Sequence, residues 1–121
     1  MKVQAYAAME RGGELVPFEY EVGELGPHEV EVEVSHCGLC HSDVHLIDND
    51  WGNSVYPLVP GHEVVGRVVG VGSQVKRRRV GERVGVGWQC GSCLHCEWCR
   101  KGDENLCAKG EATAVGHYGG F

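Results

Sequence analysis

The sequence predicts a mainly β fold, a small, bent and mostly antiparallel β-barrel with little helix and one cysteine-rich excursion. Nineteen glycines in 121 residues indicate many turns and short strands rather than a helical bundle. Short valine-rich segments recur along the chain, and five of the seven cysteines fall between Cys90 and Cys107. At this length, residues 1–121 make one modest domain, with the cysteine-rich lobe at about 88–108.

The clearest strand signal is at residues 29–34, where glutamate and valine alternate. This alternation puts three valines on one face and three glutamates on the other, which predicts a half-buried strand. Other strands are predicted where β-branched runs are bounded by turn residues. They lie at residues 3–8, 15–20, 64–69 and 80–86. The first two flank Arg11-Gly12-Gly13, a predicted hairpin turn.

Only one segment has a good helix start. Ser42 and Asp43 form a capping pair before residues 44–47, which predicts a short helix there. Residues 56–61 contain two prolines and are predicted to form an extended connection. From Gly87 onward the strand signals vanish and the cysteine segment begins.

Charge and hydropathy exclude several classes of partner. A formal net charge of −6 argues against nucleic acid and anionic membranes. The basic run at residues 76–79 is interpreted as a solvated turn. The N-terminus lacks the apolar region of a signal peptide, and no run approaches the ~20 apolar residues that span a bilayer. Crowded cysteines then indicate metal binding in a reducing compartment, so a cytoplasmic protein is expected.

The lobe carries a four-cysteine motif. Its members follow the spacing C-x2-C-x2-C-x7-C at Cys93, Cys96, Cys99 and Cys107. Such spacing lets four thiolates close a tetrahedron around one ion with no open position, which predicts a structural zinc site. An iron–sulfur centre is the rival, but a ferredoxin-type ending would put its fourth cysteine where Asp103 stands. Cys90 could replace Cys99 in a shifted register; we prefer the later four, with Cys90 as a free thiol.

A second group of ligand-type side chains lies nearer the N-terminus. The Cys37–Cys40 pair alone is compatible with a redox motif or half of a zinc ribbon, but a redox pair needs a β-α-β context that is absent. His62 lies between a glycine and a glutamate that can support a metal. One thiolate and one imidazole supply two ligands, whereas catalytic zinc needs three, and no convincing third ligand is present. Surface positions are expected for His28, His36, His95 and His117, and a small buried residue for Cys37.

Three separated motifs together resemble the zinc-dependent medium-chain alcohol dehydrogenases. Gly61-His62-Glu63-x2-Gly66-x5-Gly72-x2-Val75 matches the signature of that family. Cys-His-Ser-Asp at 40–43 and the cysteine motif at 93–107 follow in the family's order. Residues 56–66 are especially similar to the branch that contains cinnamyl alcohol dehydrogenases and bacterial aldehyde reductases.

The resemblance implies a GroES-like catalytic domain of an enzyme that moves hydride reversibly between NAD(P)H and an aldehyde or primary alcohol. It implies that Cys40 and His62 bind catalytic zinc, with Glu63 beside the metal as an alternative ligand, and that the four lobe cysteines hold structural zinc. The branch suggests NADP rather than NAD, and the complete enzyme is expected to be a homo-oligomer.

The resemblance also implies roles for residues around the metal. Ser42 would hydrogen-bond the alcohol oxygen and pass its proton, through the cofactor ribose, toward His45. Asp43 would orient the zinc-binding histidine. Trp51 would line the substrate pocket, and His41 would contact the cofactor phosphate.

The chain departs from the family beyond these motifs. The family's Rossmann domain, its third catalytic zinc ligand and the segment that completes its barrel would all lie beyond Phe121. Residues 70–75 lack the third glycine of G-x-G-x-x-G, and no β-α-β unit follows. A truncated chain that binds one zinc tightly in the lobe and is inactive alone is therefore expected. The alternative, a non-enzymatic zinc-binding interaction module, leaves the motifs at 40–43 and 61–63 unexplained.

Overall fold

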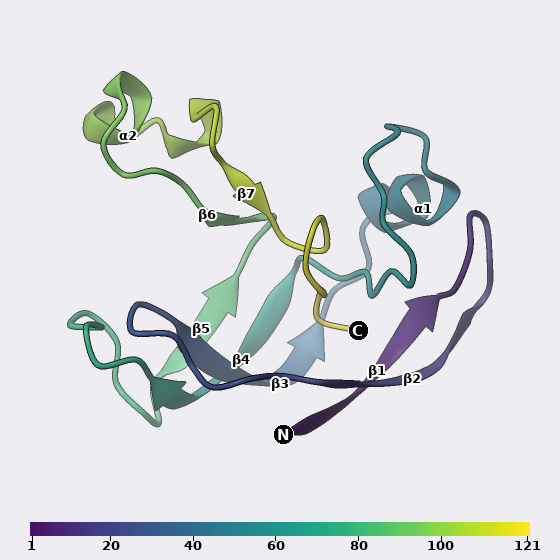
Figure 1. Ribbon diagram of the computed structural model, residues 1–121, viewed down its shortest axis with the longest axis horizontal. Helices are drawn as coiled ribbons and strands as arrows, with labels where there is room; N and C mark the ends of the chain where they lie inside the picture. Colours follow the sequence, from purple (N-terminus) through teal and green to yellow (C-terminus); the bar gives the residue numbers. More distant parts are fainter.

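Strands make up most of the regular structure of the computed structural model, which describes residues 1–121 (Figure 1). In chain order they are β1 (Lys2–Ala8), β2 (Leu15–Glu21), β3 (Val30–Cys37), β4 (Val64–Val71), β5 (Arg83–Val86), β6 (Gln89–Gly91) and β7 (Glu111–Ala112). The helices are α1 (His41–Asp48), α2 (Glu97–Lys101) and the 3₁₀ turn η1 (Glu104–Leu106). The predicted mainly β fold with little helix is confirmed, and no helix is long and apolar enough to cross a membrane.

The strands form three antiparallel sheets. β1 pairs with β2, the strands β3, β4 and β5 form a second sheet in that order, and β6 pairs with β7. The sheets bend around one another, but no continuous hydrogen-bonded barrel joins them. A backbone bridge between Ala8 and Leu58 ties the end of β1 to the extended segment before β4.

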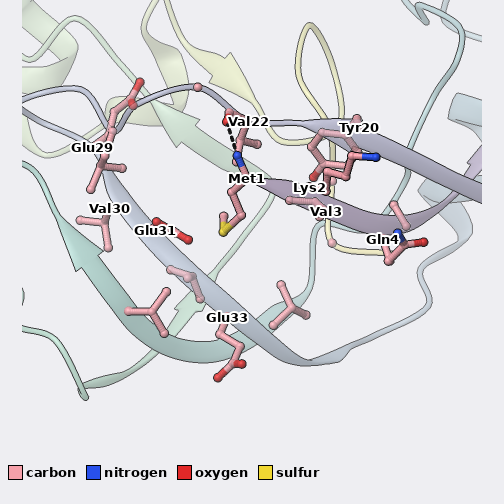
Figure 2. A pocket seen from close by; sticks show the side chains of 18 of the residues that line it. Met1, Lys2, Val3, Gln4, Tyr20, Val22, Glu29, Val30, Glu31 and Glu33 are labelled. Atoms are coloured by element: carbon pink, nitrogen blue, oxygen red, sulfur yellow. Dashed lines mark hydrogen bonds between the residues drawn. The ribbon is translucent and has the colours of Figure 1, made fainter.

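The largest hollow of the molecule, about 940 Å³, opens between the first two sheets (Figure 2). Val30, Val32 and Val34 of β3 all line it. Val30 and Val32 are half-buried, whereas 44% of Val34 is exposed. The expected burial of the valine face of residues 29–34 is thus only partial, because register shifts interrupt the β3–β4 ladder and the hollow stays open to water.

Two expectations about the later strands need correction. The strand predicted at 80–86 begins only at Arg83, because Val80 and Gly81 form a turn, in which Gly81 has a positive φ of 92° and the Glu82 N–H donates to the Arg79 carbonyl at 3.2 Å. The absence of strands after Gly87 is wrong, since β6 and β7 pair there. These strands have three and two residues, too few for an alternating pattern to be visible in the sequence.

Helix α1 begins earlier than predicted. Its N-cap is Cys40 rather than Ser42, which lies within the first turn. Asp43 occupies the third helical position, and its Oδ2 accepts the Cys40 backbone N–H at 3.0 Å. The helix ends at Asn49, which adopts the left-handed conformation with φ 55°. The prediction is therefore right about Asp43 as a capping side chain and wrong about Ser42 as the N-cap residue.

Two small apolar clusters form the buried core. One contains Ala5, Ala7 and Val59, and the other contains Leu46, Leu58 and Ala114. Leu58 and Val59 are neighbours in the extended segment predicted at 56–61, so this one segment contributes to both clusters. Packing against both clusters therefore holds this segment in place immediately before Gly61 and His62.

The last residues of the chain run beside the same segment. The N–H groups of residues 119, 120 and 121 donate to the carbonyls of Val59, Gly61 and Pro60 at 2.8, 2.9 and 3.1 Å. Gly61 is buried between the two segments with a φ of 103°. A Cβ at this position would stand 2.6 Å from the Phe121 ring and 2.7 Å from the Cys37 sulfur, so only glycine fits.

We expect Gly61→Ala to lower the free energy of unfolding by at least about 2 kcal/mol, through backbone strain and overpacking. Thermal unfolding followed by circular dichroism measures the loss. Gly52→Ala is the matched control, because Gly52 also has a positive φ, of 73°, but nothing lies within 4 Å of its Cβ position. Equal losses in the two variants would mean that φ alone, and not the contact with residues 119–121, requires glycine at position 61.

Candidate metal centres and the adjoining pocket

The four predicted lobe cysteines lie around a common point. Cys93 follows β6, Cys96 caps α2, Cys99 lies within α2 and Cys107 follows η1. Their sulfur atoms all lie within 4.8 Å of one another, and those of Cys93 and Cys99 are 3.9 Å apart. Cys90 lies outside this group.

Backbone N–H groups surround these sulfurs. The N–H of Cys96 donates to the Cys93 sulfur at 3.2 Å, and that of Cys99 to the Cys96 sulfur at 3.4 Å. The N–H of His95, helped by that of Cys96, lowers the pKa of the Cys93 thiol to about 6. A hydrogen bond from Ser92 lowers the pKa of Cys99. The Cys99 N–H also favours the Cys96 thiolate, but burial and the neighbouring sulfurs outweigh it and raise the Cys96 pKa to about 11.

The donor set of the lobe fits one zinc ion. Tetrahedral coordination with Zn–S bonds of about 2.3 Å places sulfurs about 3.8 Å apart. The 3.9 Å between the Cys93 and Cys99 sulfurs matches that spacing. An iron–sulfur cluster places several atoms between its cysteines and holds them farther apart. Four thiolates also leave no ligand position free, so the arrangement suits a structural ion.

Cys40, His62 and Glu63 form a second group. Figure 1 shows α1, which Cys40 caps, on the opposite side of the molecule from α2. The ligand atoms of the three residues lie within 4.8 Å of one another. Cys40 and His62 are half-buried and Glu63 is exposed. Sulfur, nitrogen and carboxylate oxygen form a set that zinc accepts, and the exposed side leaves room for a further ligand.

The buried Asp43 carboxylate holds this second group together. Only 3% of Asp43 is exposed. Its Oδ2 accepts the Cys40 N–H and its Oδ1 accepts the Gly61 N–H, both at 3.0 Å. Oδ1 also lies 3.3 Å from Nδ1 of His62. Engagement of Nδ1 leaves Nε2 as the nitrogen free to bind a metal, as in other metal sites where a carboxylate orients a histidine.

A pocket of about 220 Å³ adjoins the Cys40–His62–Glu63 group. Ser42, Trp51 and His62 line it, so three residues singled out from the sequence meet there. The remaining lining residues are Leu46, Asn53, Trp88, Ala112, Thr113 and Val115. Trp88 lies directly before β6 and lines the pocket, and no sequence pattern indicates this position. The larger hollow of Figure 2 contains none of the candidate ligands.

His45 is held next to the pocket rather than in its lining. Its Nδ1 lies 2.7 Å from Oδ2 of Asp50, a partner that the sequence did not indicate. The His45 ring packs against the Trp51 ring, with centroids 5.2 Å apart, and against the His41 ring at 4.8 Å. His41 itself is exposed. The first turns of α1 therefore present His41, Ser42 and His45 near one another.

The remaining histidines and the two remaining cysteines lie outside both metal groups. His28, His36, His95 and His117 are all exposed, as expected. Cys37 is half-buried, and this burial raises the pKa of its thiol. Cys90 is exposed and lies against His117, a contact that sequence reasoning missed.

Comparison with known proteins decides the family. Residues 26–121 match the alcohol dehydrogenase GroES-like domain. The chain belongs to this family. It is 57% identical to the aldehyde reductase AdhA of Synechocystis over 119 residues, which is 98% of this chain and 35% of that protein. It is 48% identical to the aldehyde reductase YahK of Escherichia coli over 107 residues, 88% of this chain and 31% of that protein.

Solved structures agree with this assignment. A cinnamyl alcohol dehydrogenase from Sorghum bicolor is 42% identical, superimposes with a TM-score of 0.86 and is matched over 93% of this chain and 32% of its own. The CAD of Helicobacter pylori in complex with NADP(H) is 30% identical, with a TM-score of 0.92 over 100% of this chain and 38% of its own. The GroES-like fold inferred from the motifs is confirmed. The chain spans about a third of the length of the relatives it matches.

We expect Cys107→Ser to lower the zinc content of the dialysed protein by one ion per chain and to unfold the lobe, since structural zinc contributes on the order of 10–16 kcal/mol in small folds. Elemental analysis and circular dichroism measure the two effects. Cys90→Ser is the matched control, because this thiol belongs to the same lobe but not to the four-sulfur group. An unchanged zinc content in Cys107→Ser would rule out the four-thiolate site.

Proposed function

We propose that this chain supplies the metal-binding catalytic part of a zinc-dependent alcohol dehydrogenase or aldehyde reductase, which transfers hydride reversibly between NAD(P)H and an aldehyde or primary alcohol. The observation that carries the proposal is the meeting of Cys40, His62 and Glu63 beside a pocket lined by Ser42 and Trp51. A non-enzymatic zinc module would need the lobe but not this second group.

Cys40 and His62 would hold the catalytic zinc, with Glu63 as the alternative ligand. The structural zinc would be held by the four lobe cysteines, Cys93, Cys96, Cys99 and Cys107. A bound zinc at the first site supplies a Lewis acid that polarises the carbonyl or lowers the pKa of the alcohol. Asp43 keeps the His62 imidazole in the tautomer with Nε2 unprotonated. Because the Asp43 carboxylate is buried and already receives two backbone N–H groups, it can hold the imidazole in a fixed orientation.

Ser42 and His45 would move the proton of the reaction. The Ser42 hydroxyl lines the pocket next to His62 and would hydrogen-bond the substrate oxygen. His45, one turn further along α1, would receive the proton. Its contact with Asp50 at 2.7 Å holds the ring in a fixed orientation. His41 would reach the cofactor phosphate from the exposed start of the same helix.

The pocket lining indicates the substrate class. Trp51, Trp88, Leu46 and Val115 give it apolar and aromatic walls. Relatives include two probable cinnamyl alcohol dehydrogenases of rice and an 8-hydroxygeraniol dehydrogenase of Catharanthus roseus. We therefore propose allylic and aromatic primary alcohols, and the α,β-unsaturated aldehydes derived from them, as substrates. NADP is the proposed cofactor, a homo-oligomer the proposed assembly of the whole protein, and the cytoplasm its proposed location.

A chimera tests the proposed function. We expect this chain, put in place of the matching N-terminal third of the Synechocystis aldehyde reductase AdhA, to give a protein that oxidises NADPH when cinnamaldehyde is added. Cys40→Ser should abolish the activity while Cys90→Ser retains it. A folded, zinc-loaded chimera without aldehyde-dependent NADPH oxidation would refute the proposal. The 121-residue chain alone should show no turnover, because its strand pairs are all antiparallel and none forms a cofactor-binding β-α-β unit.

The role of Asp43 has its own test. We expect Asp43→Asn to weaken metal binding at Cys40 and His62 by about 10- to 100-fold, since the carboxylate that orients the imidazole is lost. Titration with Co²⁺, followed by the absorption of its thiolate complex, measures the affinity after the lobe has been filled with zinc. Asp50→Asn is the matched control, because Asp50 contacts His45 and not the metal group. Equal affinity in wild type and Asp43→Asn would show that Asp43 serves the fold alone.

A further inference from the structure

A thiol and an imidazole meet outside both metal groups. Cys90 lies in the middle of β6 and His117 in the loop after β7, and their Sγ and Nε2 atoms are 2.8 Å apart. Both residues are exposed. The other ring nitrogen of His117, Nδ1, lies 3.4 Å from the Tyr118 carbonyl oxygen. A carbonyl oxygen can only accept, so this contact places the proton on Nδ1 and turns the Nε2 lone pair toward the thiol.

Local backbone structure brings the two side chains together. The β6–β7 register is irregular between Gln89 and Gly91, so Cys90 has no partner in the ladder. Ala114 and Gly116 follow β7 with positive φ values of 69° and 81°, and they turn the chain back toward β6. The Thr113 N–H donates to the Trp88 carbonyl at 2.8 Å, and its hydroxyl donates to the Gly87 carbonyl at 2.7 Å. The contact thus rests on an anchored turn.

The pair has the composition of an activated nucleophile rather than of a metal site. Two ligands are too few for zinc, and no third ligand-type residue joins them. A thiol within hydrogen-bond reach of a basic imidazole is the arrangement in which a cysteine loses its proton as it attacks. Exposure gives a reagent access to the sulfur. We propose that Cys90 and His117 form a reactive dyad that captures soft, uncharged electrophiles, α,β-unsaturated aldehydes in particular.

The preference for an uncharged electrophile follows from the surroundings. Glu111 on β7 neighbours the pair: its backbone carbonyl oxygen lies 3.5 Å from the Cys90 sulfur, and its carboxylate lies over the adjacent Gly91. This negative charge would repel anionic reagents. The choice of α,β-unsaturated aldehydes rests on the proposed function, since these would be the products of the alcohols that the pocket suits.

The reaction is an addition and needs no oxidant. The Cys90 sulfur forms a bond to the β-carbon of the aldehyde, and the electron pair of the carbon–carbon double bond moves to give an enolate. The thiol proton passes to Nε2 of His117 and from there to the α-carbon. The product is a thioether that keeps its aldehyde group.

Site-resolved alkylation of the zinc-loaded chain tests the dyad. With iodoacetamide or cinnamaldehyde at pH 7, mass spectrometry of peptides should find Cys90 modified before any other cysteine. His117→Gln should slow the modification of Cys90 by roughly tenfold or more. The difference in rate between wild type and variant should close near pH 10, where free thiols ionise without a base. Iodoacetate should react more slowly than iodoacetamide. His28→Gln, a change at an exposed histidine elsewhere, should leave the rates unaltered.

Zinc content and circular dichroism establish that His117→Gln is folded. Modification of any other cysteine before Cys90, or an unchanged rate in His117→Gln at pH 7, would overturn the dyad. Reaction with iodoacetamide but not with cinnamaldehyde would overturn the assignment of aldehydes as its reagents. The experiment with iodoacetamide assumes nothing about hydride transfer. A negative result there would therefore contradict the dyad alone, whereas an inactive chimera would contradict the proposed function.

Discussion

The buried carboxylate of Asp43 is the constraint on which the candidate active site depends. It accepts N–H groups from Cys40 and Gly61 and lies beside Nδ1 of His62. The start of α1 and the segment before β4 are far apart in the chain, and this one side chain fixes their spacing. A buried carboxylate without partners would be strongly destabilising, so it stabilises the site only while all three donors stay in place. The Cys40 thiol and the His62 imidazole are thereby brought to one point before any metal binds.

The two metal groups are constructed in opposite ways. The lobe gathers its sulfurs from residues 93–107, and backbone N–H groups of the same segment donate to the sulfurs of Cys93 and Cys96. It is local, closed and saturated with ligands. The Cys40–His62–Glu63 group joins distant segments, has one exposed member and adjoins a pocket. A closed site can only hold structure together, whereas an open one can exchange a ligand, and this difference separates their chemistry.

The sequence predicted what short spacing determines and missed what long-range packing determines. The four lobe cysteines are recognisable because their spacing is itself the requirement for binding one ion, whereas the motif around His62 is recognisable only through the family resemblance. Helix α1 was found, but its cap was misplaced by two residues, because cysteine is a rare N-cap and the Asp43 side chain bonds backward to Cys40. The pocket position of Trp88 and the contact of His117 with Cys90 gave no signal, since both depend on long-range packing. The turn that precedes His117 contains a left-handed Ala114, which no residue preference reveals.

The small buried core explains why polar contacts and metal ligands are important for the stability of this domain. A compact monomer of 13.2 kDa exposes about 6,400 Å², yet this chain exposes 8207 Å² and buries only 16 of its 121 residues. The hollow between the first two sheets accounts for part of the excess (Figure 2). Burial of apolar side chains alone therefore contributes little stability around both metal groups. The lobe in particular contributes only Cys99 to the buried residues, so we expect its order to depend on a metal ion bound by its four sulfurs.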